Sequence, residues 1–203
     1  MNQIETSSRE RKKDETRERI TRAALELFAE KGYDATTVDE ISIRADVAKG
    51  TFFNYYPRKE AVLTTLAEHE IESLEAWVEQ SLAGPGPVIA KLHAMFDFAS
   101  DSYEHEPQLR RRMLVELQKG EGQPLEAIHT RGQAAVRRLV EAGQASGELR
   151  RDADPERVTW VLRGTYIGTM MQWLFRGEPL DVRGELRARL ALILEGLGSR
   201  EGR

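Results

Sequence analysis

The sequence predicts an all-α fold of about nine helices, and three observations support that prediction. Apolar residues recur at helical spacing along most of the 203 residues. Three of the expected helices begin with a proline in their first turn, at Pro107, Pro124 and Pro155. Alternating, β-branched runs of the kind that form strands are not found. The chain is therefore expected to be built from helices alone.

The composition narrows the class of protein. The chain has no cysteine, which excludes disulfides, thiol catalysis and cysteine zinc sites. Its N-terminus lacks the apolar run of a signal peptide, and its most apolar stretch, 158–175, is interrupted by Arg163. We therefore expect a cytoplasmic protein without a membrane span. Because the net charge is −4, any affinity for nucleic acid must come from locally clustered cations.

The first sixty residues predict three helices. Residues 1–12 are polar and basic and are expected to be mobile, either as a solvated tail or as an arm that follows a DNA backbone. An apolar face indicates a helix at about 14–31, and Gly32 is placed to end it. Thr37 and Glu40 have the spacing of a capping box, which predicts the start of the second helix. A break at 46–48 separates it from a third, at about 49–56, which Pro57 stops.

Further helices are expected after this region. A long one runs from about 58 to 82 and ends before the glycines and prolines of 84–87. The remaining helical patterns lie at about 87–104, 107–119, 124–146, 154–176 and 181–197. We divide the chain into an N-terminal domain, 1–60, and a C-terminal domain, 61–203.

The residues from Thr36 to Lys59 read as a helix-turn-helix, and the third helix has two distinct faces. Phe52 and Tyr56 are four residues apart and should pack inward. The opposite side carries polar and aromatic groups suited to a DNA groove. Asn54 can pair with adenine, for example, and hydroxyl groups can contact phosphate oxygens.

This stretch resembles the TetR/AcrR family of bacterial transcriptional regulators. The resemblance rests on Ala24-x-x-Leu27-Phe28-x-x-x-Gly32-Tyr33, on Thr36-Thr37-x-x-x-Ile41 and on Val47-Ala48-Lys49-Gly50-Thr51-Phe52-Phe53-Asn54-Tyr55-Tyr56-Pro57-x-Lys59-Glu60. It implies a three-helix DNA-binding domain followed by a variable helical domain that forms a dimer and often binds a small effector. The DNA-facing residues that it implies are Thr37, Lys49, Gly50, Thr51, Phe53, Asn54, Tyr55 and Lys59.

Three positions depart from the usual family pattern. Asp46 occupies a turn position where glycine is common, and aspartate tolerates the left-handed conformation better than most residues. Its charge would lie near the DNA. Arg58 stands where a serine often caps the next helix, so we expect that cap to be lost. Ser42 replaces a common alanine on the packed side.

The C-terminal half is expected to form the dimer and to bind the effector. Gly164 and Gly168 lie four apart in an apolar helix and would permit close approach of another helix. The last helix carries an apolar stripe of Leu186, Leu190, Ile193, Leu194 and Leu197, part of which must be intramolecular core. We expect a homodimer through these last two helices. It would place two recognition helices about 34 to 36 Å apart on a pseudo-palindromic operator.

A small apolar or amphipathic effector is expected to bind among the middle helices. The candidate residues are Trp77, Phe96, Met113, Leu117, Trp160, Arg163, Tyr166 and Met170. Arg163 either pairs with a carboxylate such as Glu116 or Asp97, or anchors an anionic effector. His93 and His129 are read as satisfied or exposed histidines and not as ligands, and neither a metal nor a cofactor is expected.

The sequence favours a DNA-binding regulator, most simply a repressor that an effector releases from its operator. Enzyme motifs such as His-Glu-x-x-His or Gly-x-Ser-x-Gly are not found. Two other readings stay open at this point. One is a helical small-molecule carrier or protein-interaction module that does not act on DNA. The other is an enzyme with an unrecognised helical active site.

Overall fold

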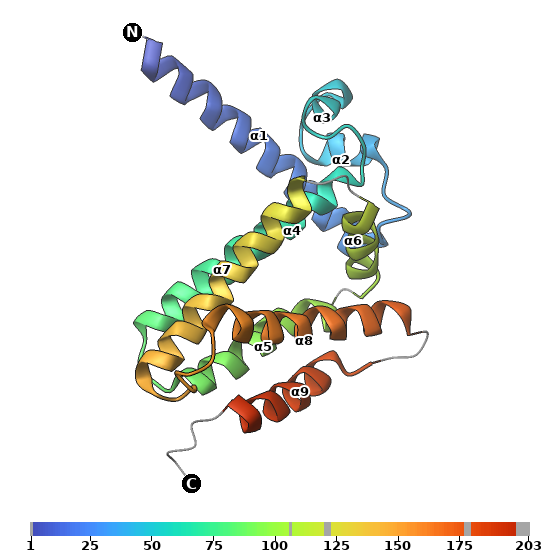
Figure 1. The fold of residues 1–203 in the computed structure, drawn as a ribbon. Coiled ribbons are helices and arrows are strands. Elements are labelled where there is room, and N and C mark those ends of the chain that lie inside the picture. The colour runs from blue at the N-terminus through green and yellow to red at the C-terminus, as the bar shows by residue number, and fades with distance from the viewer. Residues whose placement is uncertain (1, 106, 120–122, 177–179, 198–203) are drawn as a thin grey trace. The chain divides into compact units, whose positions relative to one another are not determined.

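The computed structural model describes residues 2–105, 107–119, 123–176 and 180–197, and in these residues it contains nine α-helices (Figure 1). Their bounds are α1 Asn2–Lys31, α2 Val38–Arg44, α3 Lys49–Tyr55, α4 Ala61–Ala83, α5 Val88–His105, α6 Pro107–Lys119, α7 Gln123–Ser146, α8 Pro155–Phe175 and α9 Val182–Leu197. The predicted all-α class is confirmed. From α2 onward the predicted helix bounds agree closely, except that α4 begins at Ala61 and not at 58.

The chain forms two compact units. The first contains Met1–Ala67 and Gln108–Lys119, and the second contains Glu68–Pro107 and Gly120–Arg203. Helix α4 therefore passes from one unit to the other, and α6 belongs with the first unit although it follows α5 in the sequence. The predicted division into domains 1–60 and 61–203 stays a prediction.

Helix α1 is longer than expected. It begins at Asn2 and not near residue 14, so the segment predicted to be a mobile tail or arm is helical in the structure. The residues before Asp14 include neither glycine nor proline, and Arg11 forms an ion pair with Glu15, one turn on, at 3.4 Å. The apolar face that predicts this helix begins only at Ile20 and so does not reveal its first part.

The core of the first unit joins α1, α2 and α3. Ile20, Ala24, Ile41 and Phe52 are fully buried there. Gly32 ends α1 as predicted: its φ is +86° and its N–H donates to the Phe28 oxygen at 2.9 Å. These contacts hold the two short helices against the longer α1, which places α3 at the surface.

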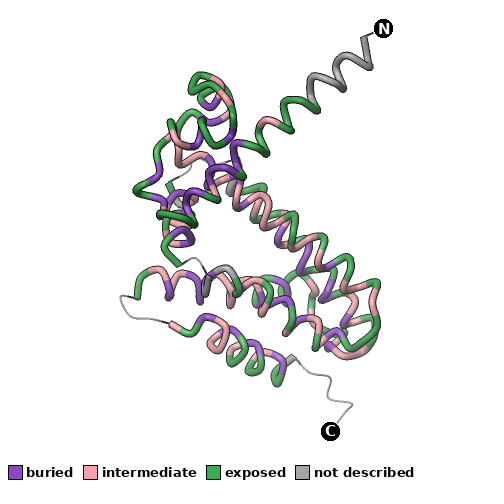
Figure 2. The backbone as a smooth tube through the Cα atoms, turned by 180° about the vertical axis from the view of Figure 1, so that it is seen from behind, coloured by how far each residue is buried: buried purple, intermediate pink, exposed green. Residues whose placement is uncertain are grey.

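The second unit packs its helices in pairs. Helix α5 packs against α9, α7 against α8, and α8 against α9. Leu92, Leu139, Leu162, Leu186 and Leu190 are fully buried between them, and Figure 2 shows such buried positions recurring along each helix. In the described part of the chain, no helix combines the length and the apolar character that crossing a membrane would need.

Candidate DNA-binding surface and effector region

A side-chain cap fixes the start of α2, the first helix of the helix-turn-helix. Thr37 and Glu40 form the predicted capping box, and Lys31 also bonds the Glu40 carboxylate. The Lys31 contact, followed by the Thr37 bonds, lowers the pKa of Glu40 to about 2. Glu40 therefore stays ionised at neutral pH. The capping-box prediction is confirmed.

Asp46 has the left-handed conformation that its position in the turn predicts, with a φ of +51°. Its N–H donates to the Ile43 oxygen at 3.1 Å, and the Val47 N–H donates to the Ser42 oxygen at 3.0 Å. This bonding pattern ends a helix and reverses the chain. Arg19 of α1 adds bonds of 2.6 and 2.7 Å to the oxygens of Ala45 and Asp46. The turn is thus held from both sides.

Helix α3 has the two predicted faces. Phe52 and Tyr56 are buried, and the Tyr56 hydroxyl bonds the Thr21 hydroxyl at 2.7 Å. On the outer side, Asn54 is exposed and Phe53 is 45% exposed. Gly50 is also exposed, and a Cβ there would meet no atom within 4 Å. The residues Thr51 and Tyr55 are half-buried. One side of α3 is therefore available to a ligand.

Lys49, at the start of α3, is already paired with a carboxylate. Its ammonium lies 2.7 Å from Asp39 Oδ1, and both side chains are mostly exposed. The pair neutralises a cation that the sequence assigned to DNA. Lys49 can contact a phosphate only by leaving Asp39 or by sharing it.

Lys59 faces the protein interior and is half-buried. Its ammonium donates to the oxygens of Tyr33 and Thr36, at 2.8 Å each, and lies 4.1 Å from the centre of the Tyr33 ring. Two of its three N–H donors are thus used within the first unit. This geometry favours a structural role for Lys59 over the DNA contact that the family resemblance implies.

Helix α6 is tied to the first unit by two ion pairs. Arg112 bonds Asp34 at 2.8 Å, and Arg58 lies 2.6 Å from Glu116, whose side chain is only 7% exposed. Arg58 thus takes part in an ion pair at the position where the sequence predicts a lost serine cap. The ties attach α6 to the turn after α1 and to the segment just after α3.

Comparison with known proteins agrees with this geometry. Residues 20–66 match the family described as bacterial regulatory proteins, tetR family. The chain is 33% identical over 188 residues to the HTH-type transcriptional regulator TcmR of Streptomyces glaucescens. The alignment covers 92% of this chain and 70% of TcmR. The chain belongs to the TetR family. It is a transcriptional regulator that binds DNA, and not an enzyme.

Two further relatives extend the similarity over the TetR-family chain as a whole. The HTH-type transcriptional regulator AcrR of Shigella flexneri is 26% identical over 198 residues, covering 89% of this chain and 88% of AcrR. The solved structure of the Thermus thermophilus TetR-family repressor FadR, in complex with lauroyl-CoA, is 32% identical. It aligns with a TM-score of 0.73 and covers 92% of this chain and 97% of FadR.

The expected effector residues of this TetR-family regulator are divided between the two units. Met113 and Leu117 lie on α6 in the first unit, and the remaining six lie in the second. Among these six, Phe96 and Met170 are buried, Trp77 stacks on Phe98 with ring centres 5.9 Å apart, and the Tyr166 hydroxyl bonds that of Tyr103 at 3.2 Å. Trp160 is 56% exposed. The full set stays a prediction.

Arg163 does not pair with the carboxylates expected for it. Glu116 is paired with Arg58, and Asp97 forms two bonds with Arg187, at 2.7 and 2.8 Å. Arg163 instead donates to the backbone oxygen of His129 at 2.9 Å. Sequence spacing could not identify this partner because a backbone oxygen is present at every residue. The predicted carboxylate pairing is therefore wrong.

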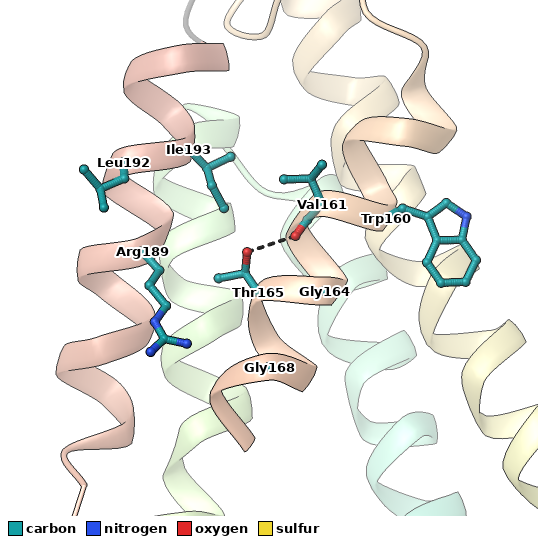
Figure 3. Close-up of a pocket in the computed structure, with 8 residues that line it drawn as sticks. All are labelled: Trp160, Val161, Gly164, Thr165, Gly168, Arg189, Leu192 and Ile193. Atoms are coloured by element: carbon teal, nitrogen blue, oxygen red, sulfur yellow. Dashed lines mark hydrogen bonds between the residues drawn. The ribbon is translucent and has the colours of Figure 1, made fainter. Parts of the chain in front are cut away.

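A shallow groove of about 410 Å³ runs between α8 and α9 (Figure 3). Its apolar lining includes Trp160, Val161 and Leu192, which are 56%, 49% and 70% exposed. Gly164 and Gly168 line it as well, and a Cβ on either would meet no atom within 4 Å. These features leave an apolar face with space for close approach.

The predicted stripe of α9 lies mostly inside the protomer. Leu186, Leu190 and Leu194 are buried, Ile193 lines the groove, and the side chain of Leu197 is outside the described residues. Leu192, which was not part of the predicted stripe, is 70% exposed. Its offset from the regular stripe is the signal that could have identified it.

Two other residues of this TetR-family chain have contacts that the sequence did not predict. Asp39 looked like ordinary first-turn charge, yet it pairs with Lys49. Arg19 looked like the solvent side of α1, yet it holds the turn before α3. Neither spacing nor charge in the sequence distinguishes them from the many other charged residues of these helices.

Proposed function

We propose that this chain is a homodimeric repressor that a small amphipathic effector releases from a pseudo-palindromic operator. The outer face of α3 is the observation that carries the DNA-binding part. Its neighbours Phe52 and Tyr56 fill the core, so Phe53 and Asn54 are left outward for a major groove. The predicted cytoplasmic location fits this role and stays a prediction.

A DNA-binding experiment tests this assignment. The full-length protein is titrated against the duplex upstream of its own gene and against a random duplex of equal length, at several salt concentrations. We expect the upstream duplex to bind more tightly at moderate salt. Equal affinity for the two duplexes would contradict operator binding there and favour a carrier or protein-interaction role.

Two substitutions separate base recognition from general attraction. Asn54→Ala should reduce the preference for the operator, because an asparagine that reads a base contributes about 1–3 kcal/mol of discrimination. Lys49→Ala should lower the affinity for both duplexes alike and make binding less dependent on salt. The same loss of preference in both variants would contradict these roles.

The groove of Figure 3 supports dimerisation through α8 and α9. A second copy would cover Val161 and Leu192 and approach closely at Gly164 and Gly168. Leu192→Asp should shift the protein toward monomer in light scattering coupled to size exclusion. Ile43→Asp is a matched control, since Ile43 is 78% exposed on α2, and it should leave the dimer intact. A dimeric Leu192→Asp protein would exclude this interface.

An acyl-CoA is the effector to test first. FadR of Thermus thermophilus was solved with lauroyl-CoA, and its similarity to this chain extends over nearly all of both chains. The ion pairs of α6 offer a route for the response, because α6 follows α5 directly and bonds the segments on either side of the DNA-binding helices. Lauroyl-CoA should then lower operator affinity. Unchanged affinity at saturating lauroyl-CoA would contradict this choice of effector.

A further inference from the structure

The first part of α1 extends beyond the core of its own unit. The buried face of α1 begins at Ile20, and residues 11–19 before it are exposed except for Thr16, which is half-buried. Figure 1 shows this stretch and α3 extending toward the same end of the first unit, and Figure 2 shows the stretch again from behind. Because it packs on little of its own unit, its surface is open to a partner.

The chemistry of this stretch favours an anionic partner. Residues 11–19 include five basic and three acidic side chains and no aliphatic or aromatic one, so they offer an apolar protein surface nothing to bury. Arg11 pairs with Glu15 at 3.4 Å. No carboxylate whose side chain the structure describes pairs with Lys12 or Lys13, and both lysines are exposed. Two adjacent ammonium groups are therefore available to phosphates.

The cations of α2 and α3 are already engaged. Lys49 of α3 is paired with Asp39, and Arg44 of α2 lies 2.8 Å from a carboxylate oxygen of Glu30. Lys59, which follows α3, donates to two backbone oxygens. Neutralised phosphates supply most of the sequence-independent affinity of a protein for DNA, which requires cations that can reach them. The unpaired lysines of α1 supply what these two short helices lack.

The two lysines lie on the side of α1 that meets the helix-turn-helix. Lys12 is seven residues before Arg19, whose guanidinium bonds the backbone oxygens of the turn before α3. Lys13 is seven residues before Ile20, which is fully buried. Residues seven apart share a helix face and are about 10 Å apart along its axis. Because a major groove is about 12 Å wide, this offset suits contact with the phosphates that border the groove.

We propose that residues 11–19 of α1 form a rigid DNA-binding arm, in which Lys12 and Lys13 bind phosphates beside the groove that α3 enters. The inference rests on the proposed function and adds a second DNA-binding surface to it. This surface lies outside residues 20–66, so the match to the tetR family does not assign it. Because a phosphate is the same at every base pair, the arm strengthens binding to any duplex without selecting a sequence.

Removal of the two charges tests the arm. The variant Lys12→Gln with Lys13→Gln keeps the helix, because lysine and glutamine have similar helix propensities. Fluorescence anisotropy should show a fall of about tenfold in affinity for the upstream and random duplexes alike, with a flatter salt dependence. Arg138→Gln with Arg157→Gln is the matched control, since both arginines are exposed on helices of the second unit and the same charge is lost. The control should keep the wild-type affinity and salt dependence.

Two substitutions at Asp14 test whether the arm must be rigid. Asp14→Ala removes an exposed carboxylate beside the lysines and keeps the helix, so DNA affinity should rise. Asp14→Pro removes the same charge, but proline disfavours a helical residue before it and so frees Lys12 and Lys13 from the helix. The helix after residue 14 persists, since a first turn tolerates proline. Asp14→Pro should bind about three- to tenfold more weakly than Asp14→Ala, because flexible lysines lose more conformational entropy on binding.

The outcomes separate the arm from the proposed function. A double lysine variant that binds both duplexes like the control would overturn the arm and leave operator binding standing. If wild type binds the two duplexes equally, operator recognition is contradicted, yet a weaker double lysine variant would still support the arm. Equal affinity of the two Asp14 variants would indicate a flexible tail and contradict the proposal. A lower urea midpoint in the double lysine variant would assign the lysines to the fold, which also contradicts it.

Discussion

The first and second units differ in how some of their polar groups are satisfied. In the first, Lys49 is already paired with Asp39, and Lys59 with two backbone oxygens. In the second, Gln133 has no partner in the described chain, and Arg163 has no carboxylate. A phosphate that contacts Lys49 would therefore have to displace or share Asp39, whereas the Gln133 amide keeps unused hydrogen-bonding capacity among the described residues.

The largest expected effect comes from the two adjacent phenylalanines of α3. Phe52 is fully buried, so Phe52→Ala should lower the free energy of unfolding of the first unit by about 3–5 kcal/mol and abolish DNA binding. Phe53 is 45% exposed. Phe53→Ala should change the free energy of unfolding by no more than about 0.5 kcal/mol and should lower the affinity for DNA. Urea unfolding followed by circular dichroism measures both. Equal losses of stability would contradict the assigned faces.

Substitution of Lys59 should change the stability of the protein more than its electrostatic attraction to DNA. Lys59→Met leaves the oxygens of Tyr33 and Thr36 without their ammonium donor, at a cost of about 1–3 kcal/mol. The salt dependence of DNA binding should stay near that of wild type, since the ammonium is turned inward. A flatter salt dependence with unchanged stability would restore the DNA-facing role that the family resemblance implies for Lys59.

Asp39 should restrain DNA binding. Asp39→Asn removes the carboxylate that neutralises Lys49 and would repel phosphate, so affinity should rise about two- to fivefold at moderate salt. Asp152→Asn is the matched control, because Asp152 is likewise paired with an arginine, Arg150, at 2.6 Å, in the second unit. It should leave DNA affinity unchanged. Fluorescence anisotropy with labelled operator duplex measures the difference, and a weaker Asp39→Asn complex would contradict this role.

The sequence predicted the parts of the fold that depend on local spacing. The faces of α3 follow from the four-residue step between Phe52 and Tyr56, and the start of α2 follows from the capping pair of Thr37 and Glu40. The dihedral angle of Asp46 could also be foreseen, because the turn requires a left-handed residue. Each of these depends on residues close together in the chain.

What the sequence could not predict depends on which helices meet. To predict that the Lys59 side chain points inward, one must know where Tyr33 lies, and Tyr33 is 26 residues away in the sequence. To predict that the Gln133 amide lacks a hydrogen-bond partner, one must know how α7 packs against its neighbours. The length of α1 was missed for another reason, since a charged segment can be helical by propensity without an apolar face to reveal it. Contacts between residues that are distant in the sequence were thus predicted less well than local geometry.

The smallest expected effect tests how tightly the turn before α3 is held. Asp46 has a φ of +51°, a conformation that costs an ordinary residue about 1–2 kcal/mol and glycine almost nothing. Glycine also loses about 0.5–1 kcal/mol more chain entropy on folding, so Asp46→Gly should stabilise the first unit by only about 0.5 kcal/mol. Asp46→Ala should destabilise it, since alanine adopts the left-handed conformation less readily than aspartate does. Arg19 bonds the backbone oxygen of this residue, so the turn should keep its shape in both variants. The DNA affinity of Asp46→Gly should therefore rise only by what the lost negative charge contributes, and an affinity loss would show that Asp46 itself positions α3.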